Sequence, residues 1–396
     1  MSSVTISKLD EEKNLYRENF VIPFVPYNQL ISFLNTIILL SLLLCPTTSF
    51  AKVPEFAGTW GSNSCQITQD SRTKAVAVVG KYAYIGGEGG FKILNISRSS
   101  NPSFVGGIDY PNNTIFALAV VGNYAYLACL GGGVKAIDIT NPAAPVEVGH
   151  YVTGTLKGIA VVGNYVYVTH LGPFDSALLV VDVTDPSMPS LIGIGDTIYG
   201  TELGKIAIHG NYAYVTETKN CLYVYVYDIT DPYNPFLTGQ IDVNEMRPDG
   251  ITTQGNYLFT ANGDGLGIFN LANNQTHPTL AGRMITNKTA SDVFIRGTCA
   301  YLVGQGMQLV NVKNVAAPTL TASTNCRAGE NYNGVAVFED YLYTGWNYNC
   351  SYTGEGSQQN GGLDVIKVTE VTPSVQRIDP IHLSIFTQQD PRIWRK

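Results

Sequence analysis

Residues 117–127 read ALAVVGNYAYL, an apolar run that ends in glycine, passes through a two-residue turn and continues as Tyr-x-Tyr. Gly-Asn between two alternating apolar runs favours the positive φ angles of a tight hairpin turn, so the phrase predicts a β-hairpin. The phrase recurs every 41–47 residues, with turn positions at Gly80, Gly122, Gly163, Gly210, Gly255, Gly297 and, in a degenerate copy, Glu339.

A second phrase follows each hairpin and predicts two more strands. Residues 178–186, LLVVDVTDP, alternate apolar side chains and end in turn chemistry, and residues 235–242, PFLTGQID, represent the short run that comes next. Four antiparallel strands at a regular period are typical of a propeller blade. The sequence therefore predicts an all-β chain, a single seven-bladed β-propeller of four-stranded antiparallel blades. A β-sandwich of the same strands would give no reason for this period.

A closed propeller needs an outer strand for its last blade, and two segments are candidates. Residues 54–58, PEFAG, resemble the fourth-strand phrase without a blade before them. Residues 373–379, PSVQRID, resemble it at the other end of the chain. We favour the N-terminal segment and keep the C-terminal segment as the alternative.

The N-terminal part of the chain has the pattern of an export signal. Residues 19–51 contain no charged side chain, and the apolar run 30–44 is followed by the small-x-small site Ser49-Phe50-Ala51. We therefore expect a signal peptide with cleavage after Ala51. An uncleaved anchor is one alternative, although the run is short for a membrane-spanning helix. A lipid-modified Cys45 is the other, although Leu44 precedes it where a small residue would be expected.

These boundaries divide the chain into three parts. We expect the signal peptide at residues 1–51, the propeller at 52–372 and a C-terminal strand or tail at 373–396. The predicted location is outside the cytoplasm: the periplasm, the cell surface or the medium. The leader that precedes the apolar run is long and partly acidic, which is unusual for such a signal.

Composition and motifs argue against several classes of protein. The 396 residues carry a formal charge of −7 and no basic stripe, which disfavours nucleic acid and, beyond the N-terminal segment, a membrane surface. The sequence has no H-E-x-x-H, G-x-S-x-G or phosphate-binding Gly-Lys motif. We therefore expect no metal, no cofactor and no catalytic residue. The rival hypothesis is a propeller hydrolase, lyase or oxidoreductase with a site at the channel mouth.

Two acidic patterns invite a functional reading, but turn chemistry explains each of them. Asp138, Asp182 and Asp228 recur at the end of the third strand, where each is expected to cap its own turn. Residues 262–265, NGDG, resemble the start of a calcium loop but lack its downstream acidic ligands. We expect a hairpin turn there.

Loop length points to one face of the propeller. The connections from fourth to first strand and from second to third strand open on the same face, and the long connections are of these two kinds: residues 109–114, 170–176, 195–202, 242–249, 325–333 and 345–361. Rigid scaffolds carry function on variable loops, so this long-loop face is expected to bind a protein, peptide or glycan. The candidate binding residues are Tyr110, His170, Tyr199, Glu202, Arg247, Arg327, Tyr332, Trp346 and Tyr348. Cys326 and Cys350 fall in two of these loops and are expected to form a disulfide.

The phrase at residues 178–186, with the Gly-Asn-Tyr-x-Tyr-Val hairpin before it, resembles the signature of the LVIVD-repeat family. The resemblance covers roughly residues 74–370. It implies a propeller on exported and surface proteins of bacteria or archaea, and it carries no general enzymatic activity. The last three copies depart from the motif, with Asn270, Asn311 and Lys367 in place of the aspartate.

Overall fold

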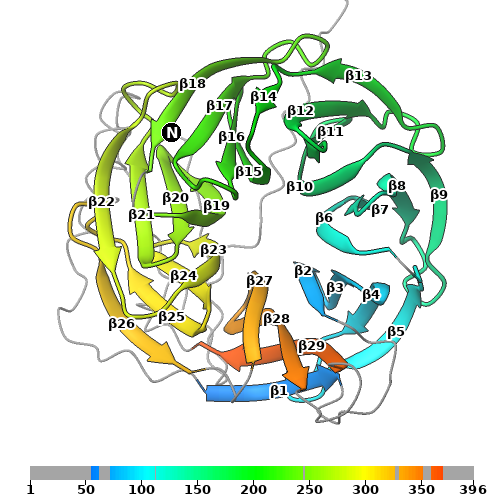
Figure 1. Cartoon of the computed structure of the whole chain (residues 1–396). Coiled ribbons are helices and arrows are strands. Elements are labelled where there is room, and N and C mark those ends of the chain that lie inside the picture. Colours follow the sequence, from blue (N-terminus) through cyan, green and yellow to red (C-terminus); the bar gives the residue numbers. More distant parts are fainter. Residues whose placement is uncertain are drawn as a thin grey trace, which may run out of the picture. The chain divides into compact units, whose positions relative to one another are not determined.

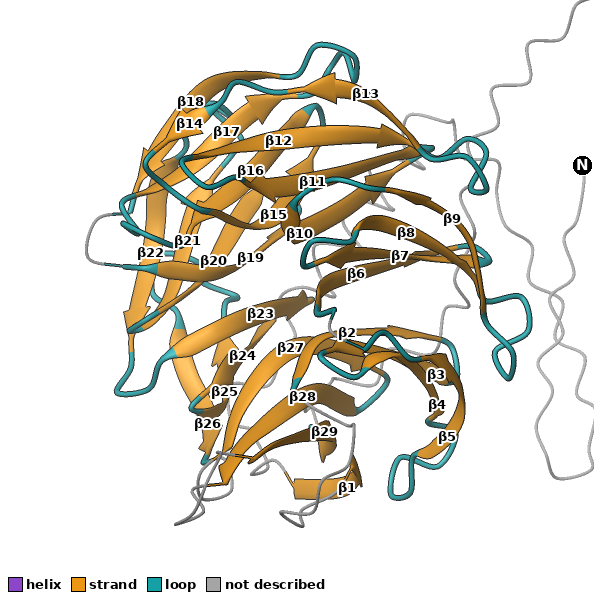
Figure 2. Ribbon diagram, turned by 45° about the vertical axis from the view of Figure 1, so that its right-hand side comes forward, coloured by secondary structure: helices purple, strands orange, loops and turns teal. Residues whose placement is uncertain are grey.

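The structure is a computed structural model that describes residues 55–61, 72–111, 113–243, 246–325, 330–350 and 358–368. Within these residues the chain forms seven antiparallel sheets in a ring, which confirms the predicted seven-bladed propeller (Figure 1). Figure 2 shows the described residues as strands and loops, with no helix among them.

Six blades have their four main strands in sequence order from the centre outward, and in the seventh blade the first strand of the chain's described part, β1, takes the outer position. The innermost strands are β2 (Thr73–Val79), β6 (Ile115–Val121), β10 (Thr155–Val162), β15 (Leu203–His209), β19 (Pro248–Gln254), β23 (Ala290–Arg296) and β27 (Glu330–Phe338). The second strands are β3 (Tyr82–Gly87), β7 (Tyr124–Cys129), β11 (Tyr165–Leu171), β16 (Tyr212–Glu217), β20 (Tyr257–Asn262), β24 (Cys299–Gly304) and β28 (Tyr341–Cys350).

The third strands are β4 (Gly90–Asn95), β8 (Gly133–Asp138), β12 (Asp175–Asp182), β17 (Tyr223–Asp228), β21 (Gly265–Asn270), β25 (Gly306–Asn311) and β29 (Gln358–Lys367). The outer strands are β5 (Ser103–Ile108), β9 (Val146–Tyr151), β13 (Ser190–Ile194), β18 (Phe236–Asp242), β22 (Thr279–Ile285), β26 (Thr319–Thr324) and β1 (Glu55–Gly61). A short extra strand, β14 (Ile198–Tyr199), pairs with the start of β12.

The hairpin turns between first and second strands have nearly the same backbone in every blade. The turn glycines have φ between +55° and +58°, a region that glycine enters without a Cβ penalty. Glu339, in the degenerate seventh copy, adopts the same conformation with φ of +51°. Only the first of the two turn residues has a positive φ in these hairpins, whereas the sequence suggested more than one positive angle per turn.

The third strands end in the predicted capping turns. Asp138, Asp182 and Asp228 each accept a hydrogen bond from the backbone nitrogen two residues later, at 2.8, 2.7 and 2.8 Å. Asn270 accepts the same bond at 2.8 Å, so an amide replaces the carboxylate without loss of the turn. These side chains are local caps rather than a ring of acids. Residues 262–265 form the expected hairpin turn, with Asn262 opposite Gly265.

The apolar core is divided into seven clusters, each between two neighbouring blades. Between the first and last blades, for example, Ile85 and Leu94 pack with Leu363 and Val365. Burying one such side chain stabilises the fold by about 1.5–3 kcal/mol. The closing interface therefore has the same kind of core as the other six.

The N-terminal segment closes the ring, as expected. β1 pairs antiparallel with β29, from Glu55 opposite Lys367 to Gly61 opposite Gly362. Gly58 lies so close to the turn of the first blade that a Cβ would come within 2.5 Å of the Ser99 carbonyl oxygen. The alternative segment, 373–379, lies outside the described residues, as do the predicted signal peptide and its cleavage site.

The seventh blade differs from the expectation in one respect. The predicted loop 345–361 is largely a long hairpin, because β28 continues to Cys350 and β29 begins at Gln358. Its sequence lacks apolar alternation, but backbone hydrogen bonds extend the ladder without needing apolar side chains. Likewise β27 begins at Glu330, inside the predicted loop 325–333.

Candidate functional site

A channel runs through the centre of the ring. Each innermost strand contacts the next one, and β27 contacts β2, so the seven strands form a closed wall (Figure 1). The channel encloses a cavity of about 120 Å³ that all seven strands line, with Lys74, Lys205 and Asp292 among the lining residues. Three charged side chains in this lining make the channel polar.

The innermost strands share a distortion that the sequence did not reveal. All seven lose register with the second strand five or six residues before the hairpin turn. Such a β-bulge adds a residue and re-aims side chains, and bulges are frequent beside functional sites. The bulged segments contain Lys74, Phe116, Lys157, Lys205, Asp249, Ser291 and Gly334.

One of these bulge residues, Lys205, forms an ion pair that skips a blade. Lys205 Nζ of β15 lies 2.8 Å from Asp292 Oδ1 of β23, although β19 stands between the two strands in the ring. Lys205 Nζ also donates to the Ser291 carbonyl oxygen at 3.0 Å. The second oxygen of Asp292 accepts a hydrogen bond from the Val335 backbone nitrogen at 3.1 Å. The fourth, sixth and seventh blades are thus joined through one carboxylate.

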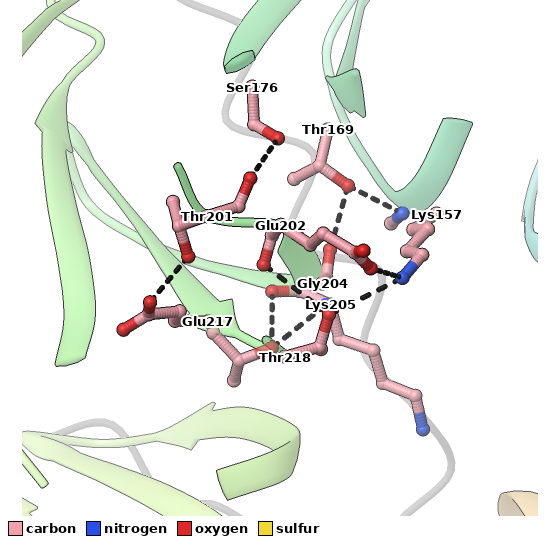
Figure 3. A network of polar contacts seen from close by, with 11 residues as sticks. Lys157, Thr169, Ser176, Thr201, Glu202, Gly204, Lys205, Glu217 and Thr218 are labelled. Atoms are coloured by element: carbon pink, nitrogen blue, oxygen red, sulfur yellow. Dashed lines mark hydrogen bonds and ion pairs between the residues drawn. The ribbon is translucent and has the colours of Figure 1, made fainter. Parts of the chain in front are cut away.

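A second ion pair joins the third and fourth blades (Figure 3). Lys157 Nζ donates to Glu202 Oε2 at 2.6 Å and lies 3.4 Å from Thr218 Oγ1. The bond from Lys157 lowers the pKa of the Glu202 carboxyl. Beside this pair, the Thr169 hydroxyl donates to the Gly204 carbonyl oxygen at 2.7 Å, so the two blades are fixed together at the channel wall.

Glu217, in the same network, is a structural carboxylate. It is 1% exposed and accepts hydrogen bonds from the Thr201 hydroxyl and from the backbone nitrogens of Leu222 and Tyr223, the latter two at 3.0 and 3.2 Å. A buried carboxylate with three donors is satisfied where it stands. We therefore assign Glu217 to holding the loop that follows β16.

Lys74 and Asp249 differ from these paired residues. Within the described part of the chain, neither side chain forms a hydrogen bond or an ion pair. Burial lowers the pKa of the half-buried Lys74 ammonium. Asp249 is open to channel water but closely surrounded by protein, and this partial loss of water, with the nearby charge of Asp292, raises the pKa of its carboxyl. The field of each charge acts on the other, so the two share one region of the channel mouth.

Two pockets open at this end of the channel, on the long-loop face. One, of about 300 Å³, is lined by Arg247 and Asp249 with Thr218, Cys221 and neighbouring residues. The other, of about 320 Å³, is bordered by Arg72, Lys74, Thr289, Ser291, Gly304, Asn331, Tyr332 and Asn333. Thr289 and Ser291 line both, so the pockets are adjacent. Each volume is at the lower end of the range for small-molecule sites.

Three predicted binding residues lie at or near this mouth. Arg247 lines the first pocket, and Glu202 is held by Lys157 beside the channel. Tyr332 borders the second pocket, but it is 4% exposed and its hydroxyl lies 3.1 Å from Asp364 Oδ2. Tyr332 therefore contributes mainly to the wall of the pocket.

The structure places the other predicted residues elsewhere. Tyr110 donates to Glu147 Oε2 at 2.6 Å on the outer strands of the second blade, and Tyr199 is 78% exposed on β14. His170 is half-buried at the end of β11. Trp346 is 1% exposed and packs between the last two blades. Arg327, Cys326 and the side chains of Tyr348 and Cys350 lie outside the described residues, so the predicted disulfide remains a prediction.

Sequence reasoning missed Lys74, Lys157, Lys205, Asp249 and Asp292. A signal for them was present, because these residues stand five or six positions before the turn of each repeat, where the copies disagree in charge. The described residues contain no group of His, Cys, Asp and Glu that could hold a metal ion. Among the described residues there is also no helix long and apolar enough to span a membrane.

Comparison with known proteins identifies a family and a fold. A family model for the LVIVD repeat matches five stretches of the chain: residues 71–109, 117–153, 154–197, 203–243 and 249–286. Among curated proteins, no sequence matches the chain.

Solved structures resemble the fold at low sequence identity. The RRP9 WD40 repeats match with a TM-score of 0.57 at 11% identity, covering 81% of this chain and all of that one. A chain of the mitotic checkpoint complex matches with a TM-score of 0.57 at 11% identity, covering 83% of this chain and 98% of that one. The computationally designed Ika8 protein matches with a TM-score of 0.53 at 12% identity, covering 80% of this chain and all of that one.

Proposed function

The chain belongs to the LVIVD repeat family, and we propose that it is an exported, non-catalytic binding module that holds an anionic group of its ligand at the channel mouth. One observation carries the proposal: the pocket around Lys74 is cationic in an acidic protein. Among the described residues, Arg72 and Lys74 border this pocket and no carboxylate does, and the whole chain has a formal charge of −7.

The remaining lining of this pocket suits the same chemistry. Thr289 presents a hydroxyl, and Asn331 and Asn333 present amides, all of which can donate to an oxyanion. The Ser291 hydroxyl instead donates to the Tyr332 carbonyl oxygen at 2.8 Å. Arg72 lies 3.6 Å from Glu88, a long contact that leaves most of its donors available. A peptide or glycan of the kind expected on the long-loop face can supply a carboxylate to this site.

One observation favours the rival hypothesis of an enzyme. Lys74 and Asp249 have shifted pKa values at a pocket, which is a frequent property of catalytic groups. The described mouth lacks an activated nucleophile, however. Its cysteine, Cys221, has a pKa raised by burial and by the charge of Glu217, which keeps it a thiol. A steady-state screen with ester, glycoside and peptide substrates would favour the enzyme if turnover disappeared in Asp249→Asn.

The proposal is tested by thermal unfolding of the exported protein with and without small anions. Acetate, phosphate and sulfate are the probes, with glycerol as the neutral control. A ligand at one hundred times its dissociation constant stabilises the folded state by about 2.7 kcal/mol, so an occupied site raises Tm.

The matched variants are Lys74→Met and Lys313→Met, since Lys313 is an exposed lysine on the turn after β25. We expect an anion to raise Tm in the wild type and in Lys313→Met but not in Lys74→Met. Equal shifts in both variants, or no shift with any anion, would contradict the proposal.

A further inference from the structure

The mouth of the channel brings together two pockets of different charge. Among the described residues, the pocket around Lys74 is lined by two cations and no carboxylate, whereas its neighbour is lined by Asp249 and Arg247. The two pockets meet at Thr289 and Ser291, so one small molecule can reach both. The Lys74 pocket is therefore cationic along its described lining, whereas its neighbour has one carboxylate and one cation.

Four charged residues border these two pockets, and within the described residues Lys74 and Asp249 are two that form no ion pair. Lys205 is paired with Asp292 and Lys157 with Glu202, at 2.8 and 2.6 Å. Within the described residues, Lys74 and Asp249 form no such ion pair. Each lies in the bulge of its own innermost strand, at the equivalent position of the repeat. A charge that is partly removed from water and left unpaired destabilises the fold, so a ligand that pairs with both would relieve two costs together.

Other charged groups face Asp249 and also affect which ligand charges the mouth can accept. Arg247 lines the Asp249 pocket without forming an ion pair with it, and Lys205, Asp292, Lys157 and Lys74 surround it within the channel. A ligand with only cationic groups would meet these cations, and a ligand with only anionic groups would meet Asp249. A ligand with both charges at opposite ends matches the mouth.

We propose that the channel mouth is a site for a free amino acid or short peptide, whose carboxylate pairs with Lys74 and whose ammonium group pairs with Asp249. This inference rests on the proposed function, because it takes the Lys74 pocket as the anion site, and it adds Asp249 as the residue that determines specificity. Pockets of about 300 and 320 Å³ suit a molecule of this size.

Three matched probes separate the two ends of the ligand. Glycylglycine carries both charges, N-acetylglycine has nearly the same shape without the ammonium group, and glycylglycine amide lacks the carboxylate. Their affinities for the full exported protein are measured by isothermal titration calorimetry. We expect glycylglycine to bind about tenfold more tightly than either blocked probe, since each lost contact is a charged hydrogen bond.

The variants assign each end to its residue. We expect Asp249→Asn to bind glycylglycine and N-acetylglycine equally, and Lys74→Met to bind glycylglycine and its amide equally. Lys313→Met is the control and should keep the full preference. Within the described residues neither Lys74 nor Asp249 forms an ion pair that the substitution would break, and a thermal unfolding curve for each variant checks that it folds.

The outcomes distinguish this inference from the function on which it rests. If N-acetylglycine binds the wild type as tightly as glycylglycine, the anion site stands and the role of Asp249 is overturned. If the preference for glycylglycine persists in Asp249→Asn, the assignment of the ammonium group is overturned. If none of the three probes binds, both the inference and the anion site fail.

Discussion

The two ends of the innermost strands differ in how far the blades share a residue type. At the hairpin end, six blades place a glycine with φ near +56° and the seventh forces Glu339 into the same conformation. At the bulge end, every blade keeps the backbone distortion but changes the side chain, from Lys74 to Phe116 to Asp249. The repeat thus copies a backbone, and the side chain at its bulge is where the blades acquire different chemistry.

The largest expected effect comes from breaking the bulge end. Asp292→Ala removes the partner of Lys205 and the acceptor of the Val335 nitrogen. Both side chains are less than one-third exposed, so we expect a loss of about 2 kcal/mol in the free energy of unfolding, measured by urea denaturation. A double-mutant cycle with Lys205→Ala isolates the pair, and additive effects in the cycle would show that the two residues are not coupled.

The next effect tests the hairpin end alone. Gly122 has φ of +57°, and a Cβ there would meet no atom within 4 Å. Gly122→Ala therefore carries only the conformational cost of a left-handed residue, and we expect a loss of about 1 kcal/mol by the same denaturation assay. A much larger loss would mean that the turn packs against something, contrary to the open surroundings of this position.

The reverse substitution sharpens the comparison. Glu339→Gly gives the seventh turn the residue of the other six, and removing the left-handed strain should stabilise the protein by about 0.5–1 kcal/mol. The Arg296 contact to residue 339 uses the backbone oxygen and survives the change. Denaturation of the single variant, compared with Glu339→Ala as a control that keeps the strain, measures the gain. No difference between the two variants would count against strain at this turn.

The smallest effect concerns Asp249 and depends on pH. The pKa of its carboxyl is raised in the folded state, so the folded protein binds this proton more tightly than the unfolded chain does. The proton therefore stabilises the fold fully at a pH below the ordinary carboxyl pKa. This contribution is lost as the pH rises through the raised pKa. Asp249→Asn should therefore raise Tm slightly at neutral pH, and this gain should vanish in acid below the ordinary carboxyl pKa. Thermal unfolding across pH 3–7 checks the trend, and a gain that grows toward acid would reverse the sign of the argument.

The fold was predictable because each repeat carries its own local signals. Gly122 marks a turn, Asp182 marks the end of a third strand, and the period of the copies requires closure. The bulges were not predictable, because one added residue leaves readable apolar alternation on both sides of it. The pairing of Lys205 with Asp292 skips a blade, and no spacing along the chain predicts which bulge residues meet across a channel.

Loop length was likewise a poor guide to which candidate residues reach the channel mouth. Trp346 follows the apolar part of a hairpin and was expected in a loop, yet the ladder continues and turns the side chain into the core between blades. Arg247 lies at the mouth because its loop leads directly into an innermost strand. Position relative to the central strands, rather than the length of the loop, decides which side chains reach the channel.

The antiparallel pairing of β1 with β29 limits when the propeller can close during synthesis of the chain. Thr59 of β1 donates to the Leu363 carbonyl oxygen across 304 residues of chain, so the first of the described strands cannot pair until the last of them has been synthesised. Until then both β1 and the edge of the unfinished ring present unpaired backbone groups, which are a template for association with other chains. A chain that stops before β29 cannot cover either edge, so closure of the ring requires that synthesis has reached β29.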